Sequence, residues 1–274
     1  MNNPSLSLSV ADLEELRHAR ELLESPGFAM KLANIFGAPV ERGFAMLPER
    51  WSTLVHEAAR ISLERALDVA LYSLDRDPKP ALTPATNVSH KLAVALSGAA
   101  GGAFGLPALS VELPISTVVM LRSIADIARS EGESLSDLDT RLNCLQVFAL
   151  GGSEAEDDAV DTGYFAVRAM LSRGFAGAAG SLLERGAVGG VGGPVVSRLV
   201  GLLTRRFSVV VSEKLAAQAV PVVGAAGGVL VNTVFMGHFQ DMARGHFIIR
   251  RLERRYGEDL VRQGYRDLQV EPAA

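Results

Sequence analysis

The chain has 274 residues, which is enough for one large domain or two modest ones with a well-buried core. Its 27 Lys and Arg residues are outnumbered by 31 Asp and Glu residues, and the resulting net charge of −4 gives no overall positive field that would attract nucleic acid. The single cysteine, Cys144, excludes an intramolecular disulfide and any cysteine-rich zinc site.

Hydrophobic residues make up 48% of the chain and aromatic residues 6%, and the mean hydropathy is +0.21. The apolar residues are mainly Ala, Val and Leu beside many Gly, a composition that favours close helix–helix approach over large sheets. The N-terminus has neither the basic region nor the apolar region of a secretory signal, so we expect a cytoplasmic protein.

The N-terminal part, residues 10–76, is predicted to be helical. Ser9 and the acidic turn that follows it are typical of a helix N-cap, and apolar residues then recur at helical spacing. Turn residues delimit a short helix over 28–36 and another over 39–47. A long amphipathic helix is predicted over 50–74.

Three blocks of sequence occur twice, in the same order. Val-Ser-x-Lys-Leu-Ala begins at Val88 and Val211, Gly-Ala-Ala-Gly-Gly at Gly98 and Gly224, and Asp-x-Ala-Arg at Asp126 and Asp241. We interpret this as a divergent internal duplication. Repeat one covers about 87–130, and repeat two, with the basic helix that follows it, covers about 210–256. Each is predicted to form a glycine-rich helical hairpin.

Helices are also predicted between the repeats, over 134–204, with a glycine-dense connector near 186–194, and a last short helix follows Gly257. No sustained alternation of apolar and polar residues predicts a strand. The sequence therefore predicts an all-α fold, with residues 1–274 forming a single helical domain.

The apolar parts of the repeats approach the length of membrane spans. Between Lys91 and Arg122 the only charge is Glu112, and between Lys214 and Asp241 there is none. A bilayer core requires roughly 20 apolar residues in one helix. Prolines interrupt the first segment, and polar residues and a proline interrupt the second, so we expect buried or interfacial helices rather than simple spans.

The repeated glycines are candidates for contact with lipid or a partner. They are Gly98, Gly101 and Gly102 in repeat one and Gly224, Gly227 and Gly228 in repeat two. Small residues permit close backbone approach in membranes, but equally at a crowded junction of soluble helices. Lys91 and Lys214 occupy matching positions, where each either extends toward lipid headgroups or marks the first polar turn.

A basic run follows repeat two. Arg250, Arg251, Arg254 and Arg255 lie on a predicted helix over 247–256 that also has an apolar side. Such a helix is typical of contact with an anionic membrane surface. The alternative is a solvated helix face with acidic partners nearby. Nucleic acid is not expected as a partner, because few aromatic residues accompany the arginines.

Two Asp/Arg pairs, Asp126 with Arg129 and Asp241 with Arg244, have the i,i+3 spacing that places both side chains on one helix face. Each pair is expected to make a local salt bridge or to contact the other repeat. His238, Asp241 and His246 are weak candidates for a metal site. They spread too widely around a helix for one three-ligand site without a further ligand, which Glu213 or Glu112 could supply from a neighbouring helix. Zinc sites normally have a tighter arrangement, so no metal or other cofactor is expected.

Nucleophilic catalysis is not indicated either. The sequence contains no Gly-x-Ser-x-Gly motif, and Cys144 lies in an apolar helical stretch, where a thiol is ordinarily buried and inert. We therefore assign no catalytic residue.

Several motifs resemble the EcsC protein family. They are Ser25-Pro-Gly-Phe28, the stretch from Asn34 to Glu41, Leu47-Pro48, the two Gly-Ala-Ala-Gly-Gly segments, Asn232-Thr233 and the stretch from His238 to Phe247. The family is named after an operon that also encodes an ABC transporter, so the resemblance implies transport or envelope biology by association. It implies no established enzymatic activity and no catalytic residues.

Together these features predict a non-enzymatic accessory protein that docks on, or partly inserts into, the cytoplasmic face of a membrane. Membrane lipid and a protein are the candidate partners. One alternative is a lipid-handling or metal-assisted hydrolase with its site between the repeats, using His238, Asp241 and Glu213. The other is a soluble carrier that encloses an apolar ligand.

Overall fold

The computed structural model describes residues 7–25, 27–36, 41–45, 47, 50–74, 106–151, 163–185, 193–219 and 224–270. Within these ranges every regular element is a helix, which confirms the predicted all-α class. The helices are α1 (Val10–Leu23), α2 (Phe28–Phe36), α3 (Glu41–Phe44), α4 (Trp51–Tyr72), α6 (Leu106–Ser130), α7 (Leu138–Leu150), α8 (Gly163–Arg185), α9 (Pro194–Ala219), α10 (Gly224–Tyr256) and α11 (Glu258–Val270).

Local sequence sets several of these boundaries. The Asp12 backbone N–H donates to Ser9 Oγ at 3.1 Å, which caps α1 as predicted. Gly132 and Gly257 have φ values of 81° and 89°, in the left-handed region that favours glycine. The chain therefore turns just after α6 and between α10 and α11 at residues without a side chain.

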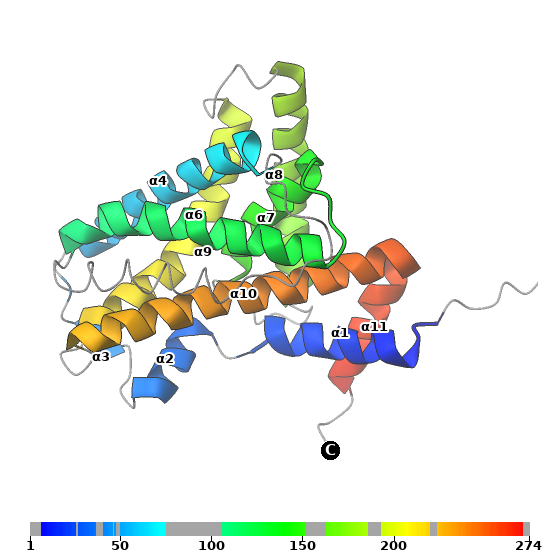
Figure 1. Ribbon diagram of the computed structural model, residues 1–274, viewed down its shortest axis with the longest axis horizontal. Helices are drawn as coiled ribbons and strands as arrows, with labels where there is room; N and C mark the ends of the chain where they lie inside the picture. The colour runs from blue at the N-terminus through cyan, green and yellow to red at the C-terminus, as the bar shows by residue number, and fades with distance from the viewer. Residues whose placement is uncertain are drawn as a thin grey trace, which may run out of the picture.

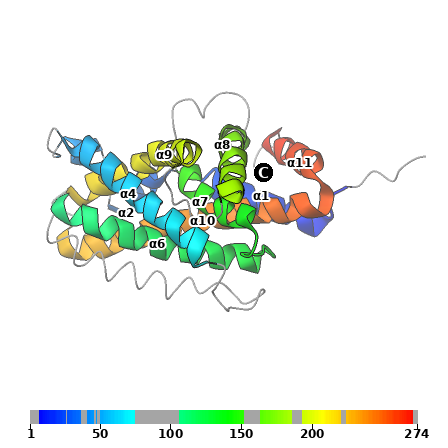
Figure 2. The ribbon, with the colours of Figure 1, turned by 90° about the horizontal axis from the view of Figure 1, so that it is seen from above.

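The longest helix, α10, organises the fold. It crosses the whole molecule in Figure 1, with α6 alongside it and α1 and α2 below. Successive residues of α6, and of the turn after it, contact successive residues of α10. Glu112 contacts Asn232, Ser123 contacts Gln240, and Glu133 contacts Arg250. The helices α6 and α10 are therefore parallel. In Figure 2, α8 and α9 lie above this pair of helices, and α4 crosses between α9 and α6.

A large core fills the space between these helices. Its centre is a group of aromatic rings from α7, α9 and α10: Phe148 lies 5.2 Å from Phe207 and 5.4 Å from Phe239, and Phe235 lies 5.2 Å from Phe239, measured between ring centroids. A second, smaller core joins α1, α8 and α11 to the C-terminal half of α10, where Tyr265 is fully buried. Because α10 contributes to both cores, it links the two halves of the fold.

The predicted hairpin repeats are only partly visible. The Asp-x-Ala-Arg blocks of the two copies lie on α6 and α10, which are parallel neighbours. Lys91, Gly98, Gly101 and Gly102 lie outside the described residues, so a hairpin in repeat one is not shown. Among the described helices, none combines the length and the apolar character that crossing a bilayer requires.

Candidate functional site

The centre of the molecule contains a buried ion pair between the two repeats. Lys214 Nζ on α9 donates to Glu112 Oε1 on α6 at 2.7 Å, and Asn232 Nδ2 on α10 donates to the same oxygen at 3.0 Å. Lys214 is 0% exposed and Glu112 8% exposed. The lysine ammonium also lies 4.9 Å from the centre of the Phe235 ring, within the range of a cation–π contact.

This position differs from the headgroup-level position expected of Lys214. The sequence pattern indicated an isolated lysine before an apolar segment, but the only charge in the matching part of repeat one, Glu112, lies against it. A charged amine without a partner is too costly to bury, whereas a paired and hydrogen-bonded one is tolerated. Lys214 therefore joins α6, α9 and α10 in the core and does not reach the surface.

Around this ion pair the surface carries little charge. Residues 109–121 of α6 and 227–240 of α10 contain one charged side chain, the buried Glu112. On the same helices three apolar side chains are exposed: Val111 by 65%, Ile115 by 54% and Leu230 by 39%. We call these three residues, Val111 and Ile115 on α6 and Leu230 on α10, the charge-poor end. It lies where α6 and α10 begin, at the left of Figure 1.

The glycines of repeat two are part of α10. Gly224 is its first residue, and Gly227 and Gly228 are buried. Along this helix, glycine permits close helix contact elsewhere as well: a Cβ at Gly245 would lie 2.7 Å from Leu23 Cγ and 2.8 Å from the Ala19 backbone oxygen of α1. Small residues on α10 therefore serve tight helix packing here.

All four predicted headgroup arginines form ion pairs with carboxylates of the protein. Arg250 Nε lies 2.8 Å from Glu133 Oε1, and Arg254 also pairs with Glu133. Arg250 also pairs with Asp139, Arg251 with Glu15 and Glu131, and Arg255 with Asp12. The acids come from α1, from the turn after α6 and from α7, and sequence reasoning did not identify them as partners.

Three of these carboxylates have shifted pKa values: burial raises the pKa of Glu131, whereas the pKa values of Asp12 and Glu133 are lowered. The hydrogen bonds from the Ser9 and Tyr256 hydroxyls, assisted by Arg255, lower the pKa of Asp12. Burial opposes ionisation of Glu133, but hydrogen bonds from Arg250 and Thr140 outweigh it, and the pKa of Glu133 is lowered. Both groups are therefore charged at neutral pH and suited to bind arginine.

The two Asp/Arg pairs behave differently. Arg129 Nη2 donates to Asp126 Oδ1 at 2.6 Å within α6, the local salt bridge that the spacing predicted. On α10, Asp241 instead accepts from Lys31 of α2 at 3.1 Å, and Arg244 lies close enough to act electrostatically on Glu131. The first pair is therefore a local salt bridge within α6, whereas Asp241 and Arg244 interact with residues outside α10.

The weak metal candidates are not brought together. His238 Nε2 lies 2.9 Å from the Gly151 carbonyl oxygen, and His246 Nδ1 lies 2.8 Å from the Tyr164 hydroxyl. Burial lowers the pKa of His238 to about 4 and that of His246 well below its usual value, so both imidazoles are neutral at neutral pH. Within the described ranges no three His, Cys, Asp or Glu side chains are grouped as metal ligands.

Cys144 is fully buried, and burial raises the pKa of its thiol. A thiol with a raised pKa is neutral and a poor nucleophile. This placement matches the buried, inert cysteine that the sequence indicated.

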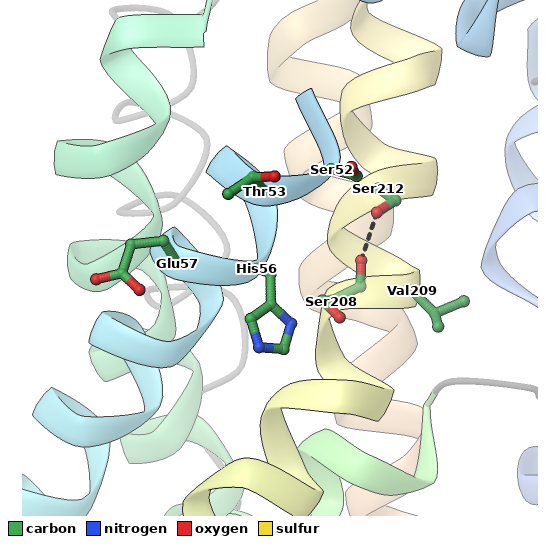
Figure 3. Close-up of a pocket in the computed structure, with 7 residues that line it drawn as sticks. All are labelled: Ser52, Thr53, His56, Glu57, Ser208, Val209 and Ser212. Atoms are coloured by element: carbon green, nitrogen blue, oxygen red, sulfur yellow. Dashed lines mark hydrogen bonds between the residues drawn. The ribbon is translucent and has the colours of Figure 1, made fainter. Parts of the chain in front are cut away.

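A groove of about 500 Å³ lies between the first turns of α4 and the middle of α9 (Figure 3). Its lining consists of Ser52, Thr53, His56, Glu57, Ser208, Val209 and Ser212. In Figure 3, His56 points between the two helices, whereas Glu57 points away from α9. The Glu57 carboxylate is bound by Arg60 at 2.6 Å, and the Ser212 hydroxyl donates to the Ser208 carbonyl oxygen of its own helix at 2.7 Å.

The groove therefore presents hydroxyl oxygens and an imidazole, but not an assembled nucleophile. Because the Ser212 hydroxyl donates its hydrogen to the Ser208 backbone oxygen, this serine does not donate to His56 as the serine of a nucleophilic pair would. The arrangement is suited to contact with a polar group and not to acyl transfer.

The model of the EcsC protein family matches residues 11–173 and 197–252 of the chain. The chain belongs to the EcsC protein family. The matched ranges contain all three members of the buried Glu112–Lys214–Asn232 cluster, together with Arg250 and Arg251. No curated protein and no solved structure matches this EcsC-family chain.

Sequence reasoning missed a second buried polar cluster in this EcsC-family protein. Arg168 of α8 donates two hydrogen bonds to Glu253 of α10, at 2.7 and 2.8 Å, and a third to the Tyr164 hydroxyl at 3.3 Å. Tyr164 in turn contacts His246. The i,i+4 spacing of Tyr164 and Arg168 was a signal that they share a helix face, but it did not reveal the partners on α10.

Proposed function

We propose that this EcsC-family protein is a non-enzymatic accessory protein that docks peripherally on the cytoplasmic face of a membrane through its charge-poor end. The observation that carries the proposal is the combination of exposed Val111, Ile115 and Leu230 with the absence of any exposed charge on residues 109–121 and 227–240. Exposed apolar patches on a soluble fold mark surfaces that contact lipid or protein.

The geometry favours shallow docking. Val111 and Ile115 are one helical turn apart, so they share a face of α6. Complete burial of an aliphatic side chain contributes about 1.5–3 kcal/mol. Three partly exposed side chains therefore supply on the order of a few kcal/mol, which suits reversible binding at the headgroup boundary. The burial of Gly227 and Gly228 within the fold also supports docking over insertion.

The hydrolase alternative receives less support from the described residues. His238 and Asp241 have separate partners, the Gly151 carbonyl and Lys31, and they are not aligned on one site. The carrier alternative would require a large apolar cavity between the repeats, whereas the space between α6, α9 and α10 holds the Lys214 ion pair and its aromatic neighbours.

Vesicle flotation with charge insertions tests the docking surface. Val111→Glu and Ile115→Glu together should reduce the vesicle-bound fraction at least about tenfold, because burying a carboxylate at a lipid interface is costly. Met170→Glu is the control, matched in charge to Val111→Glu or Ile115→Glu taken singly: Met170 is an exposed apolar residue, 40% accessible, on the distant helix α8. The control should bind like the parent chain.

Circular dichroism must show that the three proteins share one fold and one melting temperature. Equal binding of the Val111→Glu/Ile115→Glu variant and the parent would overturn the proposal. Equal loss in the Met170→Glu control would also contradict it, because the effect would then follow net charge and not the charge-poor end.

A further inference from the structure

The last turns of α10 form a second surface, distinct from the charge-poor end. We call it the arginine face and define it as Arg251, Arg254 and Arg255. Their side chains are 36%, 41% and 65% exposed. Arg250 is different: it is 18% exposed and bound to the nearly buried Glu133. The three arginines of the face therefore reach solvent, whereas Arg250 is mostly buried in its ion pair with Glu133.

Helix α1 supplies carboxylates to this face. Glu15 pairs with Arg251, and Asp12 accepts from Arg255 Nη1 at 3.2 Å and from the Tyr256 hydroxyl at 2.6 Å. The arginine face therefore already binds oxygen anions in the folded protein. Both side chains of the Arg251–Glu15 pair are exposed, and such a pair contributes little to stability, so Arg251 can exchange Glu15 for another anion at small cost. Asp12 is only 10% exposed, but its partner Arg255 is 65% exposed and can turn from it toward solvent.

An external anion can replace the carboxylates of Asp12 and Glu15 without dissociation of α1 from α10. Leu16 and Ala19 of α1 are fully buried, and Gly245 allows α1 to approach the α10 backbone closely. The helix is fixed by these apolar contacts, while the carboxylates of Asp12 and Glu15 lie on its edge beside the arginines. Only side-chain rotation is needed to turn the guanidinium groups toward an external anion.

We propose that the arginine face binds the phosphate groups of an anionic lipid surface, and that Asp12 and Glu15 act as intramolecular competitors that restrain this binding. Arginine is well suited to phosphate because its planar guanidinium donates two parallel hydrogen bonds. The restraint is electrostatic: each carboxylate occupies and neutralises a guanidinium that would otherwise contact a headgroup.

A lipid surface fits this face better than nucleic acid does. Binding of single strands depends on aromatic rings that stack with bases. The aromatic ring at this face, Tyr256, is engaged by Asp12 and lies 5.2 Å from the Arg255 guanidinium.

The inference extends the proposed membrane docking but is tested separately, because contacts of the arginine face are screened by salt and those of the charge-poor end are not. The decisive variant is Asp12→Asn/Glu15→Gln. Its matched control is Glu14→Gln/Glu21→Gln, which removes the same charge from α1 at exposed positions. Flotation uses vesicles of phosphatidylglycerol with phosphatidylcholine, and vesicles of phosphatidylcholine alone.

The Asp12→Asn/Glu15→Gln variant should bind the anionic vesicles about fivefold more tightly for each freed arginine at low salt. The gain should disappear at high salt, on neutral vesicles, and when Arg251→Gln and Arg255→Gln are added. A gain of the same size in the control, or one that survives the arginine substitutions, would overturn the proposal. No gain at all would do the same.

Glu15→Gln alone guards against misfolding, because Glu15 is half-exposed and its substitution leaves Arg251 with one carboxylate partner, Glu131, and the Ser9 cap undisturbed. It should retain part of the gain of the double variant. If the double variant binds single-stranded RNA as tightly as anionic vesicles, the face is a general polyanion surface and the lipid assignment is wrong. Failure of the Val111→Glu/Ile115→Glu test would leave these comparisons unchanged.

Discussion

Lys214 Nζ and Glu112 Oε1 lie 2.7 Å apart in a space that also contains Asn232 and the ring of Phe235. Glu112 lies on α6, and Lys214 lies near the C-terminal end of α9, directly before an apolar stretch. The pair therefore joins the two repeats at the point where neither could tolerate an isolated charge.

We expect removal of one partner to be much more damaging than removal of both. Lys214→Met should lower the free energy of unfolding by roughly 3–5 kcal/mol, because Glu112 is left buried without a counter-charge. Lys214→Met/Glu112→Leu should recover most of that loss. Urea denaturation followed by circular dichroism measures both. Equal losses in the single and double variants would mean that packing, and not charge, dominates at this position.

The exposed ion pairs of α4 provide the control for that series. Arg60 pairs with Glu57 and Glu64, and all three side chains are substantially exposed. Arg60→Gln should leave the urea midpoint unresolved from that of the parent chain, because solvent screens the pair.

Acid should destabilise the protein through His238. Its pKa is about 4 in the folded chain and about 6.5 when unfolded, so between these values the unfolded state binds more protons. Stability is complete above pH 6.5 and falls as the pH drops toward 4, by about 3 kcal/mol in total. Below pH 4 this contribution stays lost.

A variant without the His238 imidazole isolates this effect. His238→Phe should flatten the stability profile between pH 6.5 and 4 relative to the parent chain. His246, whose pKa is also lowered by burial, contributes a remaining slope in both proteins. Asp12 and Glu133 lose their charge at lower pH, because their pKa values are lowered from the ordinary carboxylate range. An identical slope in parent and variant would show that His238 is not the titrating group.

Two glycines should respond oppositely to the same substitution. A Cβ at Gly43 would lie 1.8 Å from the Ala216 backbone oxygen, so Gly43→Ala must push α3 away from α9 and should cost about 1–3 kcal/mol. Gly201 on α9 has no atom within 4 Å of such a Cβ, and Gly201→Ala should stabilise by about 0.5–1 kcal/mol through helix propensity. Thermal unfolding of both variants checks the signs; a destabilised Gly201→Ala would show that the exposed glycine has another role.

Local signals in the sequence were sufficient for many helices. The Ser9 cap and the short helix over 28–36 were predicted where the structure places them. Gly174 and Gly177 lower the helix propensity of their segment, yet α8 continues through them. There they face Leu202, Leu199 and Val195 of α9, so the lost propensity is offset by close helix packing.

The candidate site was less predictable because its contacts are long-range. Lys214 and Arg250–Arg255 were recognised as unusual positively charged positions, but their partners lie 102 to 243 residues away in sequence. Helical periodicity identifies the face of a residue, not which helix covers it. The Glu131–Gly132–Glu133 turn has no distinctive pattern of its own, although it supplies the carboxylates for three arginines.

The length of α10 also has a consequence for biosynthesis. Arg255 contacts Asp12 across 243 residues of sequence, and the buried faces of Leu16 and Ala19 on α1 have their partners in the same late region. At a synthesis rate of about 5–20 residues per second, Arg255 is synthesised about 12–50 seconds after Asp12. Nascent chains that stop before α10 therefore lack the partner of this apolar surface of α1, and the contacts between α1 and α10 form only after α10 has been synthesised.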